Sequence, residues 1–470
     1  MKFSLGKSEG IKVKFVCSNE GESCGCIGDA FKNKLFKGTV GETFVGKNKH
    51  DDLVLYVGVG EEPTIEDYKF ASYSAIKYLI SKEFENANIC IHESNLDYRE
   101  MVLAAVEGAI HGNYIFDKFK TTKKDIEINE IGLILKQELD NIETDIDELV
   151  NKMDGVITAR NLVNEPSMYL YPETLAKIAK ETLEPLGVKV TVYDKAQIEE
   201  FGMTAFLSVG RGSAKEPKLI VMEYNDVSDN PIALVGKGLT YDSGGYSLKP
   251  SDGMKTMQSD MGGSASVIGA MQAIASNKLN ANVVGIVAAC ENMVSGDSYK
   301  PGDLIYSMSG KTIEIDNADA EGRVTLADAV YFATDKYSPA KIVDLATLTG
   351  ACVVALGEVY TGAITNDPLF LSNFLDSAKN EDECVWELPN DEKYKELNKS
   401  TVADIKNSGG RLGGAITAGQ FVGEFLKNDI PWIHLDIAGT AFLGKSQKYL
   451  PAGGTGVMVK TLYNYVKNNG

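Results

Sequence analysis

The chain has 470 residues, which is long enough for two or three domains with large hydrophobic cores. Its composition, 44% hydrophobic and 24% charged, is typical of a soluble globular protein. The net charge of −19 disfavours a general nucleic-acid-binding or anionic-membrane-binding surface, because either partner would repel it.

Targeting signals and disulfides are not expected. The first ten residues lack the apolar core of a signal peptide, and no run of about 18 apolar residues is present to cross a membrane. The seven cysteines are odd in number and scattered, without zinc-ligand spacing. Cys24 and Cys26 could form a redox pair, although a surface loop is the better interpretation. We therefore expect a cytoplasmic protein.

Residues 1–150 alternate strand and helix patterns. Strands are expected at 52–59, 88–92 and 126–135, and helices after Thr64 and after the N-capping Asp97. This pattern predicts a smaller N-terminal α/β domain with a mostly parallel sheet. It contains no cluster of charged residues that suggests a site.

Residues 141–165 have one apolar stripe at helical spacing and an acidic start, which suits the N-terminal end of a helix dipole. They predict a long linker helix between two domains.

A larger α/β domain is expected over 151–470, with a mixed, largely parallel sheet flanked by helices. A helix is predicted at 173–183. Strands of this sheet are predicted at 189–192, 218–224, 231–235, 282–289, 312–315, 341–345 and 432–437. Ligands of such sheets bind at the carboxyl ends of strands.

Two charged clusters follow these strands. Residues 317–324 place Asp319, Glu321 and Arg323 at alternate positions, which predicts an extended segment with all three on one side. Residues 236–263 carry Lys237, Asp242, Lys249 and Asp260 on glycine-containing loops.

A P-loop is excluded, because Gly238 follows Lys237 where a hydroxyl residue is required. The four carboxylates, Asp242, Asp260, Asp319 and Glu321, would be neutralised by two divalent cations. None of the four histidines lies in either cluster, so the metals would be held by carboxylates and perhaps an amine.

Together the clusters resemble the leucyl aminopeptidase family, the two-metal cytosol aminopeptidases. The family signature Asn-Thr-Asp-Ala-Glu-Gly-Arg-Leu is matched at 317–324, except for Ala318 and Val324. The upstream family block is matched at 236–263. Shorter matches occur at 301–303, 308–312, 344–350 and 432–439, and the likeness covers about 155–465.

The resemblance implies a metallo-aminopeptidase that releases N-terminal residues, preferably leucine and other apolar ones, from peptide substrates. Metal ligands would be Lys237, Asp242, Asp260, Asp319 and Glu321, with Asp242 and Glu321 bridging. Two divalent ions are expected per subunit. Oxygen-rich ligation suits Mn²⁺ or Mg²⁺, while the affinity order favours Zn²⁺.

The same resemblance assigns the remaining roles. Lys249 would polarise the scissile carbonyl, and Arg323 would hold a bicarbonate ion that acts as general base. The pocket for the first side chain would be lined by Lys249, Met257, Thr347, Gly350, Ala438 and Ala441. A homohexamer and a macro-like N-terminal domain are also implied.

Three departures from the family pattern stand out. Gln258 occupies a position where lysine is common, and Ala318 replaces a threonine whose hydroxyl would orient a ligand. Ala441 replaces a larger methionine, which predicts a pocket that accepts bulky side chains.

Other functions remain open. A dinuclear-metal hydrolase of another ester or amide class would use the same metals. A bacterial aminopeptidase with an additional DNA-binding regulatory role is disfavoured by the acidic charge balance. An inactive homologue is disfavoured because all seven charged positions are present.

Overall fold

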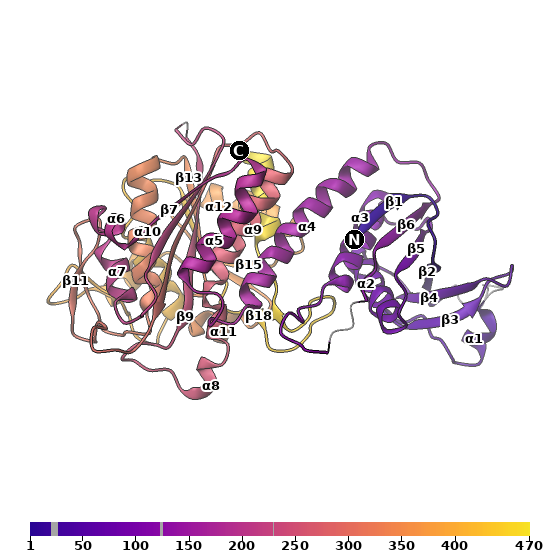
Figure 1. Cartoon of the computed structure of the whole chain (residues 1–470), viewed down its shortest axis with the longest axis horizontal. Coiled ribbons are helices and arrows are strands. Elements are labelled where there is room, and N and C mark those ends of the chain that lie inside the picture. The colour runs from indigo at the N-terminus through magenta and orange to yellow at the C-terminus, as the bar shows by residue number, and fades with distance from the viewer. Residues whose placement is uncertain (20–26, 123–125, 229) are drawn as a thin grey trace. The chain divides into compact units, whose positions relative to one another are not determined.

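The computed structural model describes residues 1–19, 27–122, 126–228 and 230–470 (Figure 1). Cys24 and Cys26 lie outside these residues. The chain forms two compact units, one of residues 1–153 with 446–451 and the other of residues 154–445 with 452–470. We call them the N-terminal and C-terminal units.

The N-terminal unit contains a six-stranded sheet in the order β1-β6-β5-β2-β4-β3. All neighbours pair in parallel except β3, which is antiparallel to β4. The strands are β1 (Lys2–Leu5), β2 (Ile11–Cys17), β3 (Thr43–Lys47), β4 (Leu53–Gly60), β5 (Asn86–Ile91) and β6 (Glu130–Leu135). The predicted mostly parallel sheet is confirmed, although β6 is shorter than expected and β1 to β3 were not predicted.

Helices α2 (Ile65–Ser81) and α3 (Tyr98–Asn113) pack against each other. Their backbones touch, because a Cβ atom at Gly108 would lie 2.0 Å from the Lys69 carbonyl oxygen. Thr64 caps α2 and Asp97 caps α3 through side-chain hydrogen bonds to backbone N–H groups, as predicted. A short helix, α1 (Gly28–Lys32), precedes β3.

The boundary between the two units falls within α4 (Ile142–Asn164), which is the long helix that the sequence predicts.

The C-terminal unit is built on an eight-stranded sheet in the order β15-β14-β17-β13-β9-β10-β8-β7. The four central strands are parallel to one another, while β7, β8 and β14 pair in antiparallel fashion with their inner neighbours. The strands are β7 (Lys189–Tyr193), β8 (Lys218–Tyr224), β9 (Ile232–Asp242), β10 (Val283–Asn292), β13 (Lys341–Ala346), β14 (Thr361–Thr365), β15 (Val385–Glu387) and β17 (Trp432–Asp436). This is the mixed, helix-flanked sheet that the sequence predicts.

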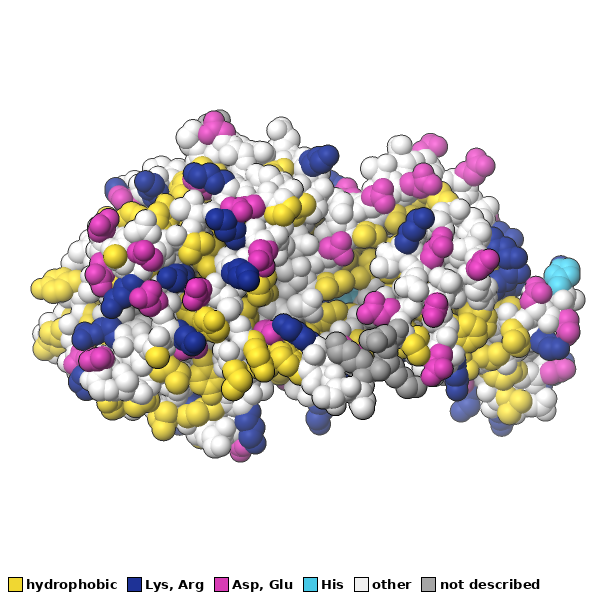
Figure 2. Space-filling view, in the orientation of Figure 1, with side chains coloured by type: hydrophobic (Ala, Val, Ile, Leu, Met, Phe, Trp, Pro, Cys, Tyr) yellow, Lys and Arg dark blue, Asp and Glu magenta, His cyan; other side chains and the backbone are white. Residues whose placement is uncertain are grey.

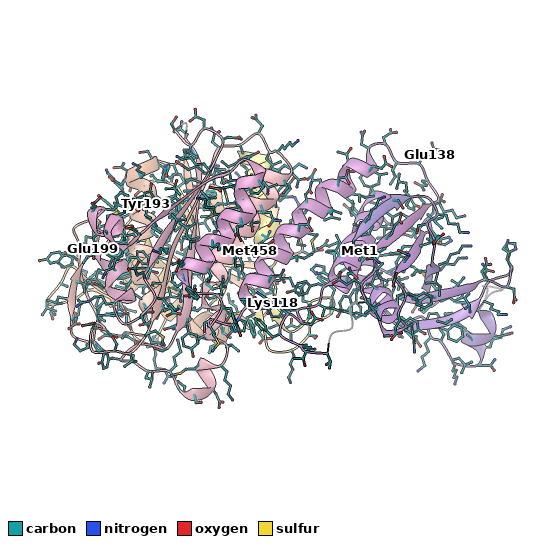
Figure 3. All side chains as sticks on the ribbon, in the orientation of Figure 1. Met1, Lys118, Glu138, Tyr193, Glu199 and Met458 are labelled. Carbon is teal, nitrogen blue, oxygen red and sulfur yellow. The ribbon has the colours of Figure 1, made fainter. Side chains whose placement is uncertain are left out.

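Helices cover both faces of this sheet. Figure 1 shows α5 (Pro172–Leu183), α9 (Gly262–Ser276) and α12 (Pro368–Asn380) on one side. On the other side lie α6 (Lys195–Glu200), α7 (Thr204–Gly210) and α10 (Glu321–Tyr337). Tyr193, labelled in Figure 3, ends the edge strand β7. Its ring packs edge-on against Phe201, with ring centroids 5.0 Å apart.

Four strands of the C-terminal unit differ from the sequence prediction in extent, in sheet or in being unexpected. Strand β9 continues to Asp242, so Lys237 lies on the strand and not on a loop. The predicted strand at 312–315, observed as β12 (Thr312–Glu314), belongs to a separate three-stranded sheet with β11 (Leu304–Tyr306) and β16 (Ile405–Lys406). Strands β14 and β15 were not predicted.

Acidic and basic side chains are interspersed over most of the face visible in Figure 2. Within the described residues, none of the helices is both long and apolar enough to cross a membrane.

Candidate metal centre

Strand β9 brings Lys237 and Asp242 to the same face of the sheet. They are five positions apart in the sequence, an odd number, so regular alternation along a strand would point their side chains to opposite faces. The pairing with β10 shifts at one place: Cys290 pairs with Leu239, and Glu291 pairs with Tyr241, which leaves Thr240 as an extra residue. This bulge resets the alternation, and Asp242 then lies on the Lys237 side, directly beside Asn292.

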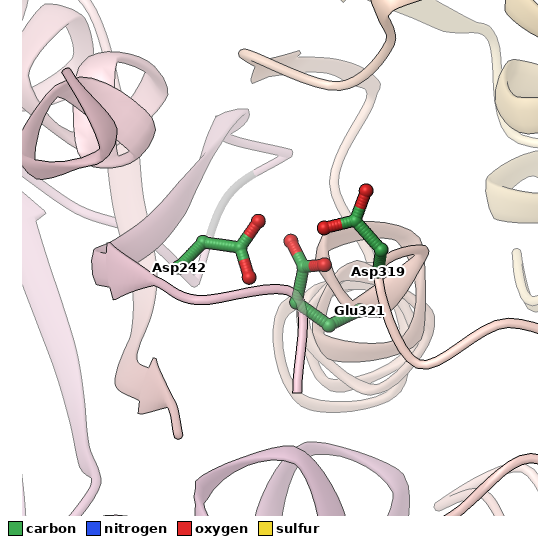
Figure 4. A group of neighbouring side chains, drawn as sticks. All are labelled: Asp242, Asp319 and Glu321. Carbon is green, nitrogen blue, oxygen red and sulfur yellow. The ribbon is translucent and has the colours of Figure 1, made fainter. Parts of the chain in front are cut away.

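Asp319 and Glu321 approach from the loop before α10. Helix α10 begins at Glu321, so Glu321 and Arg323 lie in the first helical turn. The predicted extended segment is therefore wrong at these two positions. A carboxylate is stabilised there by the N-terminal end of the helix dipole. One oxygen each from Asp242, Asp319 and Glu321 lie within 4.8 Å of one another (Figure 4).

Asp260 and two lysines complete the cluster. Asp260 lies on a short 3₁₀ helix, Met257–Met261, that leads into α9. Lys237 Nζ is 2.8 Å from Asp260 Oδ1 and 3.0 Å from Glu321 Oε1. Lys249 Nζ is 2.7 Å from Asp242 Oδ2 and 2.5 Å from Asp319 Oδ1. The five predicted metal ligands and Lys249, which was predicted to polarise the scissile carbonyl, thus lie close together.

The cluster contains more negative than positive charge. Burial and the neighbouring carboxylates raise the pKa of Asp260 to about 6 and that of Glu321 to about 8. Burial alone would lower the pKa of Lys237 and of Lys249, but the surrounding acids raise both. The cluster has four carboxylates and only two ammonium groups. Bound cations would supply the positive charge that the carboxylates lack.

Unpaired oxygens show where such cations fit. Asp260 Oδ2 and Glu321 Oε2 are buried and have no hydrogen-bond partner among the described residues. A buried carboxylate oxygen without a partner is costly, and coordination to a divalent cation would satisfy it. These residues therefore fit the metals that the family resemblance implies.

Arg323 has spare donors. Its Nη1 donates a hydrogen bond to the Asn407 carbonyl oxygen at 3.0 Å, while its buried Nε has no partner in the described part of the chain. Burial lowers the pKa of Arg323 to about 10, with Glu321 and Asp436 opposing that shift, so the guanidinium stays charged at neutral pH. It can hold an anion.

One cavity of about 880 Å³ contains the cluster. Its walls include every site residue named from the sequence except Ala441: Lys237, Asp242, Lys249, Met257, Asp260, Asp319, Glu321, Arg323, Thr347, Gly350 and Ala438. Ala441 is buried, and a Cβ at Gly262 would lie only 3.1 Å from its Cβ, so Ala441 packs beneath the start of α9. Its neighbour Phe442 lines the cavity instead.

Gln258 and Ala318 are the two other departures from the family pattern. Gln258 is not among the described residues that line the cavity. The backbone of Ala318 is held by side chains: its N–H donates to Ser247 Oγ, and its carbonyl oxygen accepts from Asn292 and Tyr299. The loop is therefore oriented without a hydroxyl at position 318.

Sequence reasoning missed three residues of the site. Asn292 Nδ2 donates to Asp242 Oδ1 at 2.8 Å, Asn407 holds the loop before α10, and Gly322 packs against Lys237. Extending the predicted strand at 282–289 would have placed Asn292 beside Asp242. Gly322 lies within the signature matched at 317–324, where a glycine can indicate a close approach of neighbouring atoms. Asn407 gives no signal, because its contacts join segments far apart in the sequence.

Comparison with known proteins gives a consistent result. Residues 157–463 match the model of the cytosol aminopeptidase family, catalytic domain, and residues 19–123 match the model of that family's N-terminal domain. The chain belongs to the cytosol aminopeptidase family. The predicted resemblance is confirmed, and the protein is a hydrolase of the aminopeptidase class.

Individual relatives agree along the whole chain. A probable cytosol aminopeptidase of Clostridium tetani is 50% identical over 477 residues, which cover 99% of each chain. One from Treponema denticola is 49% identical over 472 residues and covers 98% of each chain.

Two solved structures are similar. The bottromycin maturation enzyme BotP in complex with Mn superposes with a TM-score of 0.89 at 30% identity, covering 97% of this chain and 99% of BotP. A mutant of tomato leucine aminopeptidase superposes with a TM-score of 0.89 at 30% identity, covering 100% of this chain and 97% of its own. Manganese is thus present in one structural relative of this family member.

Proposed function

We propose that this aminopeptidase releases N-terminal residues, with leucine and other apolar residues preferred, from peptides by attack of a water activated at a two-metal centre. The observation that carries the proposal is the convergence of four carboxylates from three segments in one cavity, with buried oxygens of Asp260 and Glu321 unsatisfied. The family assignment supports an aminopeptidase, and this geometry supports two cations.

Five residues would hold the two cations: Lys237, Asp242, Asp260, Asp319 and Glu321. Mn²⁺ and Zn²⁺ are the leading candidates, with Mg²⁺ as a third, because the ligands are mainly carboxylate oxygens. Two divalent cations bound there supply a water of lowered pKa and an anchor for the free amine of the peptide. Lys237 can serve as a ligand only after losing its proton, against the raised pKa that the acids give it.

Lys249 is proposed to bind the scissile carbonyl oxygen. Its side chain is 17% exposed and lines the cavity, and its ammonium contacts Asp242 and Asp319. Once these acids are neutralised, the ammonium is free to stabilise negative charge on that oxygen. In the metal-free protein, the same acids raise the pKa of Lys249 against the opposing effect of burial.

Arg323 is proposed to hold a bicarbonate ion that takes the proton of the attacking water. Its free Nε and its position in the cavity wall support an anion site. The first side chain of the peptide is proposed to enter the region lined by Met257, Thr347, Gly350 and Ala438, which is apolar apart from one hydroxyl.

Metal removal and replacement test the proposal. The purified protein should hydrolyse Leu-p-nitroanilide after addition of Mn²⁺ or Zn²⁺ and lose that activity after dialysis against a chelator. Asp319→Ala is expected to bind less metal and to lose activity. Asp335→Ala, which changes a half-exposed acid on α10, the helix that follows the Asp319 loop, should retain both.

Hydrolysis of p-nitrophenyl phosphate in place of the amide would instead support a different dinuclear-metal hydrolase. Two metals per chain by elemental analysis are expected for the proposed site, and a chain that binds none would overturn it.

Assembly and location are part of the proposal by family likeness. A hexamer is expected, and light scattering after gel filtration would measure its mass. A cytoplasmic location follows from the names of the relatives, and cell fractionation would test it.

A further inference from the structure

Asn407 is a buried residue next to the metal centre that neither the sequence motifs nor the cavity wall includes. It directly follows β16 and has no exposed surface. Its backbone N–H donates to the Glu314 carbonyl oxygen at 2.9 Å, which ties it to the end of β12. Among the described residues that line the cavity, its neighbour Ser408 is present and Asn407 is not.

Both the oxygen and the nitrogen of the Asn407 carboxamide form hydrogen bonds to the loop before α10. Its Oδ1 accepts hydrogen bonds from the N–H groups of Asp316 at 2.9 Å and Asn317 at 3.1 Å. Its Nδ2 donates to the carbonyl oxygens of Asn317 at 2.7 Å and Ala320 at 3.3 Å. An amide offers two donors and a two-fold acceptor, so these four bonds use its full capacity.

That loop is the one that supplies the site with its ligands. Asp319 lies within it, and Ala320 is the N-cap of α10, whose first residue is Glu321. The position of the loop backbone therefore sets where both carboxylates begin.

The Asn407 main chain acts on a second group. Its carbonyl oxygen accepts the 3.0 Å hydrogen bond from Arg323 Nη1, which is the only hydrogen bond that the Arg323 guanidinium makes among the described residues. One buried residue thus holds both the ligand-bearing loop and the arginine that faces the cavity.

We propose that Asn407 is a positioning residue for the metal centre: its carboxamide fixes the loop that carries Asp319, and its backbone orients Arg323. The inference deepens the proposed function and rests on it for the catalytic readout. Asn407 would contact neither substrate nor metal, so its loss should affect the chemical step and the metal site more than substrate binding.

Asn398 provides a matched control. It is also a buried asparagine of the C-terminal unit, and its Nδ2 donates to the Thr417 carbonyl oxygen at 2.8 Å. It makes no hydrogen bond to residues 316–323 in the described structure. Replacing either asparagine with alanine removes buried hydrogen bonds, but only one replacement releases the loop.

The test compares Asn407→Ala and Asn398→Ala with the wild type as purified full-length chains. Asn407→Ala should lower kcat for Leu-p-nitroanilide by about 100-fold and leave KM within about threefold, because small misplacements of catalytic groups act on the chemical step. Calorimetric titration of the metal-free protein with Mn²⁺ should show one binding step weakened by about 10- to 100-fold. Asn398→Ala should change neither quantity by more than about threefold.

Asn407→Asp keeps the acceptor oxygen and loses the donors to Asn317 and Ala320. It tests the positioning role if the alanine variant does not fold. It should show the same split between kcat and KM. Wild-type kcat and wild-type metal titration in either folded variant would overturn the inference. Failure of both variants to fold would also overturn it, because Asn407 would then be a residue of global stability.

Wild-type protein without aminopeptidase activity would refute the proposed function alone. A weakened metal titration in Asn407→Ala would still support the positioning role in that case.

Discussion

Gly322 and Lys237 are in contact within the metal centre. A Cβ atom at position 322 would lie 2.3 Å from Lys237 Cε and 2.6 Å from Lys237 Nζ. Because Gly322 has no side chain, Lys237 has space to reach Asp260 and Glu321 past the first turn of α10.

Gly322→Ala is expected to displace the Lys237 ammonium and to disturb the metal site. We expect a loss of bound metal and a fall in kcat/KM of about 100-fold or more, because ligands displaced by about 1 Å no longer share one geometry. Elemental analysis and Leu-p-nitroanilide kinetics would measure both. Gly296→Ala is the control, since a Cβ there meets no atom within 4 Å. Full metal content in Gly322→Ala would contradict this account.

His434 is expected to make stability depend on pH. It lies opposite Asp344 on adjacent parallel strands, with His434 Nδ1 2.6 Å from Asp344 Oδ1. Burial lowers the pKa of His434, but Asp344 outweighs it and the pKa is raised overall. The protonated histidine thus stabilises the fold at pH values below its ordinary pKa of about 6.5, and that contribution is lost as pH rises through the raised value.

The measurement is urea unfolding of metal-free wild type and His434→Asn between pH 6 and 9. Tryptophan fluorescence reports the C-terminal unit, because Trp386 and Trp432 both lie in it. Wild type should be more stable at pH 6, and the gap between the two proteins should narrow as pH rises. A gap that stays constant would show that His434 is not charged in the folded state.

Arg411 is expected to recognise the C-terminal carboxylate of short peptides. It is exposed, it lines the cavity, and no acidic side chain of the described residues lies within ion-pair distance of it. The acids that line the cavity are those of the metal centre, which are already paired with lysines.

Arg411→Gln should lower kcat/KM for Leu-Gly-Gly by about tenfold, the size of one charge-assisted hydrogen bond, and leave Leu-Gly-Gly-amide unchanged. Arg211→Gln is the matched control, because Arg211 is an exposed arginine that lines a different pocket. Equal losses on the acid and the amide would rule out carboxylate recognition.

Gly350 is expected to leave room for a large first side chain of the peptide. It is the first residue of α11 (Gly350–Leu356), it lines the cavity, and a Cβ there would meet no atom within 4 Å. Gly350→Leu should fill that space and lower kcat/KM for Phe-p-nitroanilide at least tenfold more than for Ala-p-nitroanilide, as steric changes of this size do in other pockets. Parallel losses on both substrates would instead place the first side chain elsewhere.

Much of the fold follows from local patterns. Periodic apolar residues and capping residues predict α2, α3 and the long helix α4, and apolar runs predict β8, β10 and β13. The residues of the metal centre are also readable from the sequence, because the two charged clusters match the family motifs at 236–263 and 317–324.

The course of β9 was not predictable in the same way. Gly236 and Gly238 suggest a loop, yet both lie inside a central strand. They are glycines because neighbours approach closely: a Cβ at Gly236 would lie 2.7 Å from the Gly263 carbonyl oxygen, and one at Gly238 would lie 2.8 Å from Val287 Cγ1. Such contacts depend on tertiary packing and leave no local signal.

The supports of the site are hidden for the same reason. Asn407 lies 84 residues from Arg323, and nothing between them in sequence indicates the contact. Asp319, Glu321 and Arg323 alternate as in a strand, but the helix begins among them, so spacing alone gave the wrong local structure.

The single extra residue at Thr240 has a wider meaning for related chains. Without a bulge, a carboxylate would have to follow the lysine by four positions, not five, to share its face of the sheet. A homologue that keeps the five-position spacing but pairs regularly would turn this aspartate to the opposite side of the sheet, so the spacing of the two ligands is informative only together with the bulge.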